Sequence, residues 1–165
     1  MNVNIYIETA FRGPVKRRMA GAWIVEYVAK SGQPVTRGGM LYTDMATELE
    51  MSLMLIRQAF SILTKTCCVR VSTQCQSVLG TMQNHWLWQW RKNGWINARS
   101  KPVKNVHMWE QCADLIEKHI TEWTDGDHSY RQCMLGQVSK EMNREHEVKE
   151  PGNYLVIDVS EWNTR

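Results

Sequence analysis

The chain has 165 residues and 43% hydrophobic residues, which suits one globular domain with a sizeable core and is too short for two. Its net charge of +3 does not by itself indicate a nucleic-acid partner, so the location of the cations matters more than their sum. Five cysteines without a Cys-x-x-Cys pair argue against a structural zinc site. The chain shows no secretory signal and no apolar run of the roughly 20 residues that span a membrane, so we expect a cytoplasmic protein with no membrane partner, forming a single domain over 1–165.

The N-terminal part of the chain predicts three strands in an antiparallel meander. β-Forming residues run over 3–8, 21–29 and 35–42, and turns containing Gly and Pro separate these runs. Apolar residues then recur with helical spacing from Leu49 to Leu63, after Thr43 or Thr47 as the N-cap. Cys67–Ser72 suits a buried strand that pairs in parallel with the first strand.

Helical patterns dominate the C-terminal half. One covers about 76–90, breaks at Gly94 and resumes after Pro102 to about Lys118. A short strand at 120–124, a last helix over 129–144 and a tail strand at 154–159 follow, the tail as a whole being about 148–165. This order predicts an α/β fold with a mixed five-stranded sheet, an antiparallel meander plus parallel strands, flanked by helices.

One segment, 86–109, combines tryptophans with cations and contains no acidic residue. The tryptophans at its start are Trp86, Trp88, Trp90 and Trp95, and its cations are Arg91, Lys92, Arg99, Lys101 and Lys104. Nucleic-acid grooves combine stacking rings with phosphate-neutralising charge in this way. The alternative is that Trp86, Trp90 and Trp109, spaced as on a helix face, belong to the core while the cations alone meet phosphates.

Parts of this segment resemble type 1 ribonucleases H. Residues 90–95 read WRKNGW, and residues 101–106 read KPVKNV before Trp109, as in the bacterial pattern Trp-Lys-x-x-Gly-Trp and Pro-Val-Lys-Asn-x-Asp-Leu-Trp. The resemblance implies a ribonuclease H-like fold with a basic protrusion at about 86–105, which in that family grips the DNA strand of an RNA/DNA hybrid. It assigns nucleic-acid contacts to Trp86, Trp90, Arg91, Lys92, Trp95, Arg99, Lys101, Lys104 and Asn105, and outside the protrusion to Thr47 and Gln76.

The same resemblance implies an incomplete catalytic set. These enzymes hold two magnesium ions with four carboxylates. The acid at the end of the first strand is matched by Glu8, and we place the acid of the first helix at Glu50. The two remaining aspartates are replaced by Gln74, in Ser-Thr-Gln-Cys, and by Met134, in Tyr-Arg-Gln-Cys-Met. Magnesium prefers hard oxygen ligands, so only Glu8 and Glu50 are implied metal ligands, and Mg²⁺ or Mn²⁺ is expected to bind weakly if at all.

The resemblance leaves three functions open. The leading one is an inactive or strongly impaired domain that binds an RNA/DNA hybrid or duplex without cutting it. The second is an active metal-dependent ribonuclease, in which Asp125 or Asp127 replaces a lost carboxylate and His128, in the loop similar to the family's Trp-x-Lys-Gly-His, assists the leaving group. The third is a scaffold that docks a protein partner. A loop histidine without a catalytic role is the alternative for His128.

Overall fold

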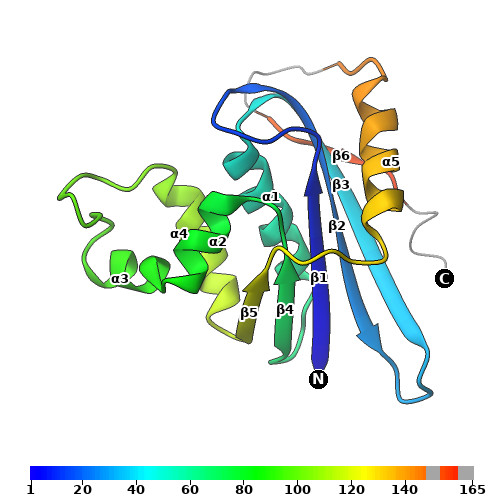
Figure 1. Cartoon of the computed structure of the whole chain (residues 1–165), viewed down its shortest axis with the longest axis horizontal. Helices are drawn as coiled ribbons and strands as arrows, with labels where there is room; N and C mark the ends of the chain where they lie inside the picture. Colours follow the sequence, from blue (N-terminus) through cyan, green and yellow to red (C-terminus); the bar gives the residue numbers. More distant parts are fainter. Residues whose placement is uncertain (148–152, 160–165) are drawn as a thin grey trace.

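The computed structural model describes residues 1–147 and 153–159. One mixed sheet runs through it in the order β5-β4-β1-β2-β3-β6, with helices on both faces (Figure 1). The strands are β1 (Asn2–Thr9), β2 (Arg17–Val28), β3 (Pro34–Ala46), β4 (Cys68–Ser72), β5 (Ile120–Thr124) and β6 (Leu155–Ile157), and the helices are α1 (Glu48–Ser61), α2 (Gln76–Gln83), α3 (Trp86–Lys92), α4 (Val106–Ile116) and α5 (Arg131–Met142).

The strand connections confirm the expected α/β class. β1, β2 and β3 form the antiparallel meander, and β4 and β5 continue the sheet in parallel with β1. The expected number of five strands is wrong, because β6 pairs antiparallel with β3 and adds a sixth strand to the described sheet. Of the tail expected at about 148–165, residues 148–152 and 160–165 lie outside the described part of the chain.

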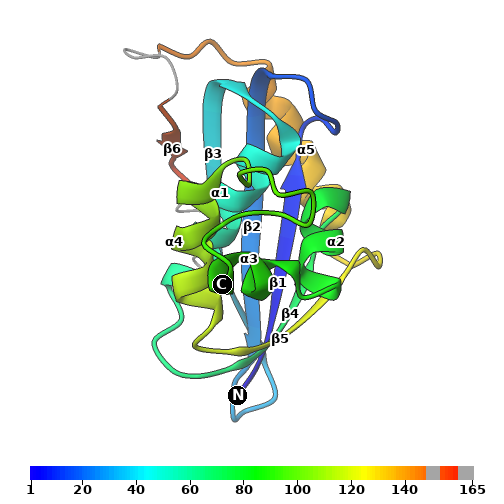
Figure 2. The ribbon, with the colours of Figure 1, turned by 90° about the vertical axis from the view of Figure 1, so that its left-hand side faces the viewer.

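The two faces of the sheet carry separate apolar clusters. Alternate residues of a strand point to opposite faces, so on β2 the side chains of Trp23 and Val25 pack in the cluster that contains α1 residues, while Ala22 and Ile24 pack with α5. Figure 2 shows α1 and α5 on opposite sides of the sheet. Gly39 on β3 makes room for an indole, because a Cβ there would lie 2.4 Å from Trp23 Nε1. None of the described helices is long and apolar enough to span a membrane.

The parallel strands bring polar residues to one edge of the sheet. Tyr6 of β1 pairs with Ser72 of β4, and Ser72 pairs with Thr124 of β5, so β4 and β5 end side by side and β1 continues past them to Thr9. The segments that follow these ends therefore lie close together, as do the carboxyl ends of strands in other open parallel sheets. This edge carries the candidate active site.

The helical region expected over 76–90 is broken in two. His85 adopts a left-handed conformation with φ 59°, which ends α2 and lets α3 leave in a new direction. After α3 the chain forms a loop closed by a bridge between Ile96 and Pro102, and α4 begins after Asn105, which is also left-handed. Figure 1 shows α3 and this loop projecting away from the sheet.

Candidate active site and nucleic-acid interface

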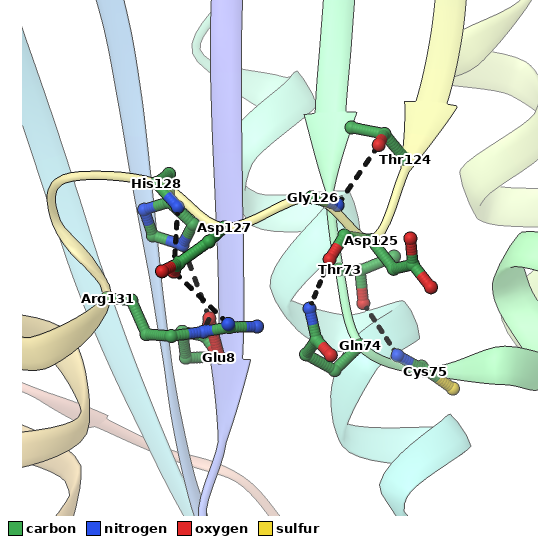
Figure 3. A network of polar contacts seen from close by, with 10 residues as sticks. All are labelled: Glu8, Thr73, Gln74, Cys75, Thr124, Asp125, Gly126, Asp127, His128 and Arg131. Atoms are coloured by element: carbon green, nitrogen blue, oxygen red, sulfur yellow. Dashed lines mark hydrogen bonds and ion pairs between the residues drawn. The ribbon is translucent and has the colours of Figure 1, made fainter.

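Glu8 lies near the end of β1 with only 4% of its side chain exposed. Its Oε1 accepts a hydrogen bond from Arg131 Nε at 3.1 Å, and His128 Nε2 lies 3.2 Å from the same oxygen. Arg131 is the first residue of α5, and His128 comes from the loop that leads into it (Figure 3). The carboxylate of Glu8 is therefore already paired with a cation from the opposite end of the sequence.

The loop before α5 is fixed over this end of β1. Asp127 Oδ1 accepts from Arg131 Nη1 at 3.1 Å, and the ring of His128 stacks on Tyr6 with centroids 4.3 Å apart. Tyr6 and Tyr130 both donate their hydroxyl groups to Glu26. Burial, followed by the hydrogen bond to Glu26, raises the pKa of Tyr130 to about 12. The same two causes raise the pKa of Tyr6, so both phenols stay protonated donors at neutral pH.

Glu48, and not Glu50, lies in the hollow beside Glu8. The hollow is lined by Glu8, Glu48 and Gln74 among others, and its volume of about 10 Å³ holds roughly one water molecule. The side chain of Glu50 instead turns back to the backbone N–H of Thr47 at 3.0 Å, and Thr47 Oγ1 accepts from the Glu50 N–H at 3.1 Å. These two hydrogen bonds form a capping box, which directs the Glu50 side chain away from the hollow. The Thr47 side chain is likewise bonded to the backbone at the start of α1.

The environment of Glu48 makes its charged form unfavourable. Its Oε1 accepts from the Gly13 N–H at 3.1 Å, and Arg12 lies close enough to act electrostatically. Burial raises the pKa of Glu48, while the Gly13 N–H and the Arg12 charge partly lower it again. The loop between β1 and β2 thus offsets only part of the cost of burying the Glu48 carboxylate.

Gln74 and Met134, which stand where the family has aspartates, lie in different surroundings. Gln74 lines the hollow, but its Nε2 donates to the backbone oxygen of Asp125 at 2.7 Å, which ties the end of β4 to the loop after β5 (Figure 3). Met134 is fully buried in the apolar cluster between α5 and the sheet, where it packs with residues such as Tyr42. Gln76 is exposed, and its amide is 3.5 Å from the Gln74 carbonyl oxygen.

The tryptophans of the protrusion divide between core and surface. Trp109 is 2% exposed, Trp90 contacts it edge to face with centroids 5.9 Å apart, and Trp86 is 45% exposed. Trp95 is half-buried and has a positive φ of 64°, with its N–H donating to the Trp90 carbonyl at 2.6 Å. Trp86 and Trp90 line an open groove with Ile96 and Arg99. Trp86 is therefore the exposed indole of this groove.

One cation of the protrusion differs from the others. Arg91 donates to Asp114 at 2.5 Å and pairs with Glu117 at 3.3 Å, so its charge is used to hold α3 against α4. Within the described part of the chain, the remaining cations of the protrusion have no carboxylate within ion-pair distance, and their side chains are exposed: Lys92, Arg99, Lys101 and Lys104. Asn105 supplies the backbone oxygen that begins α4.

Comparison with known proteins agrees with this geometry. The family described as RNase H matches residues 1–125. The chain belongs to the ribonuclease H family. Ribonuclease HI of Pseudomonas aeruginosa is 31% identical over 121 residues, which are 73% of this chain and 77% of that protein. The chain spans about half the length of other curated relatives, among them the ribonucleases H of Pseudoalteromonas atlantica and Zymomonas mobilis.

Solved structures confirm the expected ribonuclease H-like fold. LC9-RNase H1, a type 1 RNase H with the type 2 active-site motif, superposes with a TM-score of 0.66 at 18% identity, covering 99% of this chain and 81% of that one. The foamy viral protease-reverse transcriptase in complex with RNA/DNA hybrid gives a TM-score of 0.58 at 14% identity, over 84% of this chain and 19% of that one.

The residues at the edge of the sheet do not fit the magnesium pair of this family. Of the residues that the structure describes, only Glu8 and Glu48 supply carboxylates to the hollow, and the one on Glu8 is already bonded to Arg131. Among the described residues, no three His, Cys, Asp or Glu side chains gather in a way that could hold a metal ion. A guanidinium beside the carboxylate repels a second cation, so these residues do not support a chemical step that depends on a metal ion.

The sequence analysis did not assign Glu48 or Arg131 to the site, although the sequence contains an indication of each. Glu48 precedes Leu49, which preserves the Glu-Leu pair of the family motif, whereas Thr47 and Glu50 have the spacing of a capping box. The segment Tyr-Arg-Gln-Cys-Met resembles the family pattern Asn-Glu-x-Cys-Asp, in which a glutamate stands at the position of Arg131, so the charge at that position is reversed. A reversed charge beside a lost acid is the signal that indicates a rebuilt site.

Proposed function

We propose that this chain is a nucleic-acid-binding member of the ribonuclease H family that holds an RNA/DNA hybrid or a similar duplex without cutting its RNA strand. The observation that carries the proposal is the hollow at the end of β1, where two carboxylates remain and an amide stands where the family has an acid. Hydrolysis by the family mechanism needs ions that activate water and stabilise the leaving oxygen, and this set of ligands does not support them.

The protrusion supports the binding half of the proposal. Lys92, Lys101 and Lys104 are exposed around the loop that projects from the sheet, and their charge is available for phosphates. The exposed indole of Trp86, at the start of α3, offers a face for a sugar or base. The foamy viral enzyme with the same fold is known in complex with an RNA/DNA hybrid, which agrees with this class of ligand.

The alternative of a rebuilt metal site has less support. Asp127 is 78% exposed and its Oδ1 binds Arg131, while Asp125 contributes its backbone oxygen to Gln74. Neither aspartate adds a carboxylate to the hollow next to Glu8. His128 lies against Glu8 with 7% of its side chain exposed, so its role is to pack and pair within the loop and not to reach a leaving group.

The test is a binding and cleavage assay on one hybrid. The chain is titrated into a labelled RNA/DNA hybrid and into matched duplex DNA from 50 to about 300 mM salt, and the same hybrid is incubated with Mg²⁺ or Mn²⁺. We expect affinity that falls steeply with salt, because counterions are released from the phosphates, together with an intact RNA strand. Metal-dependent cleavage that Glu48→Gln abolishes would establish the enzyme, and absence of binding even at the lowest salt would favour the protein-docking scaffold.

A further inference from the structure

The carboxylate of Glu8 is buried deeply enough to require a permanent counter-ion. It is 4% exposed, and an unpaired charge at that depth would strongly destabilise the fold. Arg131 supplies the guanidinium at 3.1 Å, with 19% of its own side chain exposed. Its Nη1 is held in turn by Asp127, so the fork of the guanidinium is oriented from two sides.

Arg131 is presented to Glu8 by the way α5 packs. Met134 and Val138 are buried against the sheet, which fixes the rotation of the helix and directs Arg131, one turn earlier, towards the end of β1. Figure 3 shows the guanidinium of Arg131 lying directly against the carboxylate of Glu8. The methionine in the fourth acid position and the arginine three residues before it thus form one arrangement, since burial of the first places the second.

We propose that the Arg131 guanidinium takes the position of a divalent cation at Glu8, so that the Glu8 carboxylate has its counter-ion within the chain and this edge of the sheet binds no metal ion. On the other side of the hollow Arg12 offsets the charge of Glu48. The charges of Arg131 and Arg12 offset those of Glu8 and Glu48, whereas a set of four carboxylates leaves about four negative charges for metal ions to neutralise. The inference deepens the non-cleaving half of the proposed function, but it concerns the protein alone and does not depend on nucleic-acid binding.

The first experiment measures metal binding and its effect on thermal unfolding of the full chain. Wild type, Arg131→Gln and the matched control Arg144→Gln, whose arginine pairs with buried Glu141 on the same helix, are melted in EDTA and in 5 mM Mn²⁺. We expect wild type to melt at the same temperature in Mn²⁺ as in EDTA. Arg144→Gln should likewise show no difference between the two buffers. Arg131→Gln should melt about 5–10 °C lower than wild type in EDTA and recover roughly 3 °C or more in Mn²⁺, because the freed carboxylates then attract the ion.

A second measurement keeps the test decisive if Arg131→Gln does not fold. Free Mn²⁺ is followed by electron paramagnetic resonance during titration into wild type and Glu8→Gln. No site tighter than about 1 mM in wild type supports the proposal, whereas one ion bound per chain and lost in Glu8→Gln overturns it. Destabilised Arg131→Gln that gains nothing from Mn²⁺ also overturns it, because Arg131 is then an ordinary ion-pair partner. These measurements contain no nucleic acid, so failure of hybrid binding leaves their outcome unchanged.

Discussion

Gln74 Nε2 donates to the backbone oxygen of Asp125 at 2.7 Å, and this bond joins the end of β4 to the loop after β5. The residue that stands in place of an acid has therefore acquired a structural role that a carboxylate could not perform, since a carboxylate has no N–H to donate. The segments that follow β4 and β5 are thus held together by a side-chain amide.

Gln74→Asp should lower stability without restoring cleavage. The change removes the donor to Asp125 and places a negative charge near two other acids, so we expect a loss of roughly 1–2 kcal/mol, or a melting temperature about 3–6 °C lower. Thermal unfolding and a hybrid-cleavage assay with Mg²⁺ measure both effects. Gln76→Asp is the control, because Gln76 is exposed at the start of α2 where an acid is tolerated. Cleavage by Gln74→Asp alone would contradict the assignment of Arg131 as the counter-ion.

Reversing the charge of the exposed lysines in the protrusion should weaken hybrid binding. The triple change of Lys92, Lys101 and Lys104 to Glu is expected to reduce affinity at least roughly tenfold and to make its dependence on salt shallower, because fewer counterions are released. Lys30→Glu reverses one charge at an exposed position in the β2–β3 turn, and Lys92→Glu, which reverses one charge in the protrusion, is compared with it; Lys30→Glu should have little effect. Equal losses in these two single variants would show that only the total charge matters.

Trp86 and Trp109 should respond in opposite ways to truncation. Trp86→Ala removes a 45% exposed indole, so we expect hybrid affinity to fall roughly tenfold while the melting temperature changes little. Trp109→Ala empties a core position that is 2% exposed and should lose about 3–5 kcal/mol of stability. Fluorescence anisotropy with a labelled hybrid and thermal unfolding separate the two effects. An unchanged affinity for Trp86→Ala would assign binding to the cations alone.

Glu48→Gln should stabilise the chain increasingly as pH rises. Burial raises the pKa of Glu48 above its ordinary value of 4.5, so the folded chain holds this proton more tightly than the unfolded chain. Its contribution to stability is full below about pH 4.5 and is lost as pH rises through the folded pKa. Melting temperatures of the variant and wild type should converge near pH 4 and diverge towards pH 7, with the variant higher. Glu145→Gln, at an exposed position, should show no such divergence.

The capping box of α1 should contribute to stability and not to the site. Thr47→Ala removes the oxygen that accepts from the Glu50 N–H, with an expected loss of about 1 kcal/mol. Glu50→Gln retains an oxygen that can reach the Thr47 N–H, so its effect should be smaller. Denaturant unfolding measures both. An effect of Glu50→Gln on hybrid binding that exceeds its effect on stability would return Glu50 to the nucleic-acid site.

Local patterns predicted most of the strands and helices, because the period of apolar residues records which face of each element is buried. The break at His85 was not predicted, since a positive φ at a histidine leaves no mark in hydrophobic periodicity. The sixth strand was expected at 154–159 but not counted in the sheet, because pairing with β3 depends on where the chain returns in space.

The composition of the candidate site followed from sequence only in part. The loss of acids at Gln74 and Met134 can be read directly from the motifs, and so can the collection of cations and tryptophans after residue 86. Which glutamate of α1 enters the hollow depended on a hydrogen bond between Thr47 and Glu50, a choice that the short motif leaves open.

Sequence alone thus determined the class of fold, the protrusion and the missing carboxylates, because each is a property of residue type and spacing. Only the tertiary structure decided what replaces the missing groups. Arg131 and Glu8 are separated by 123 positions, and their contact exists because β1 ends beside the start of α5 and Met134 sets the rotation of that helix. An ion pair of this kind depends on distances across the fold, which no local pattern of residues encodes.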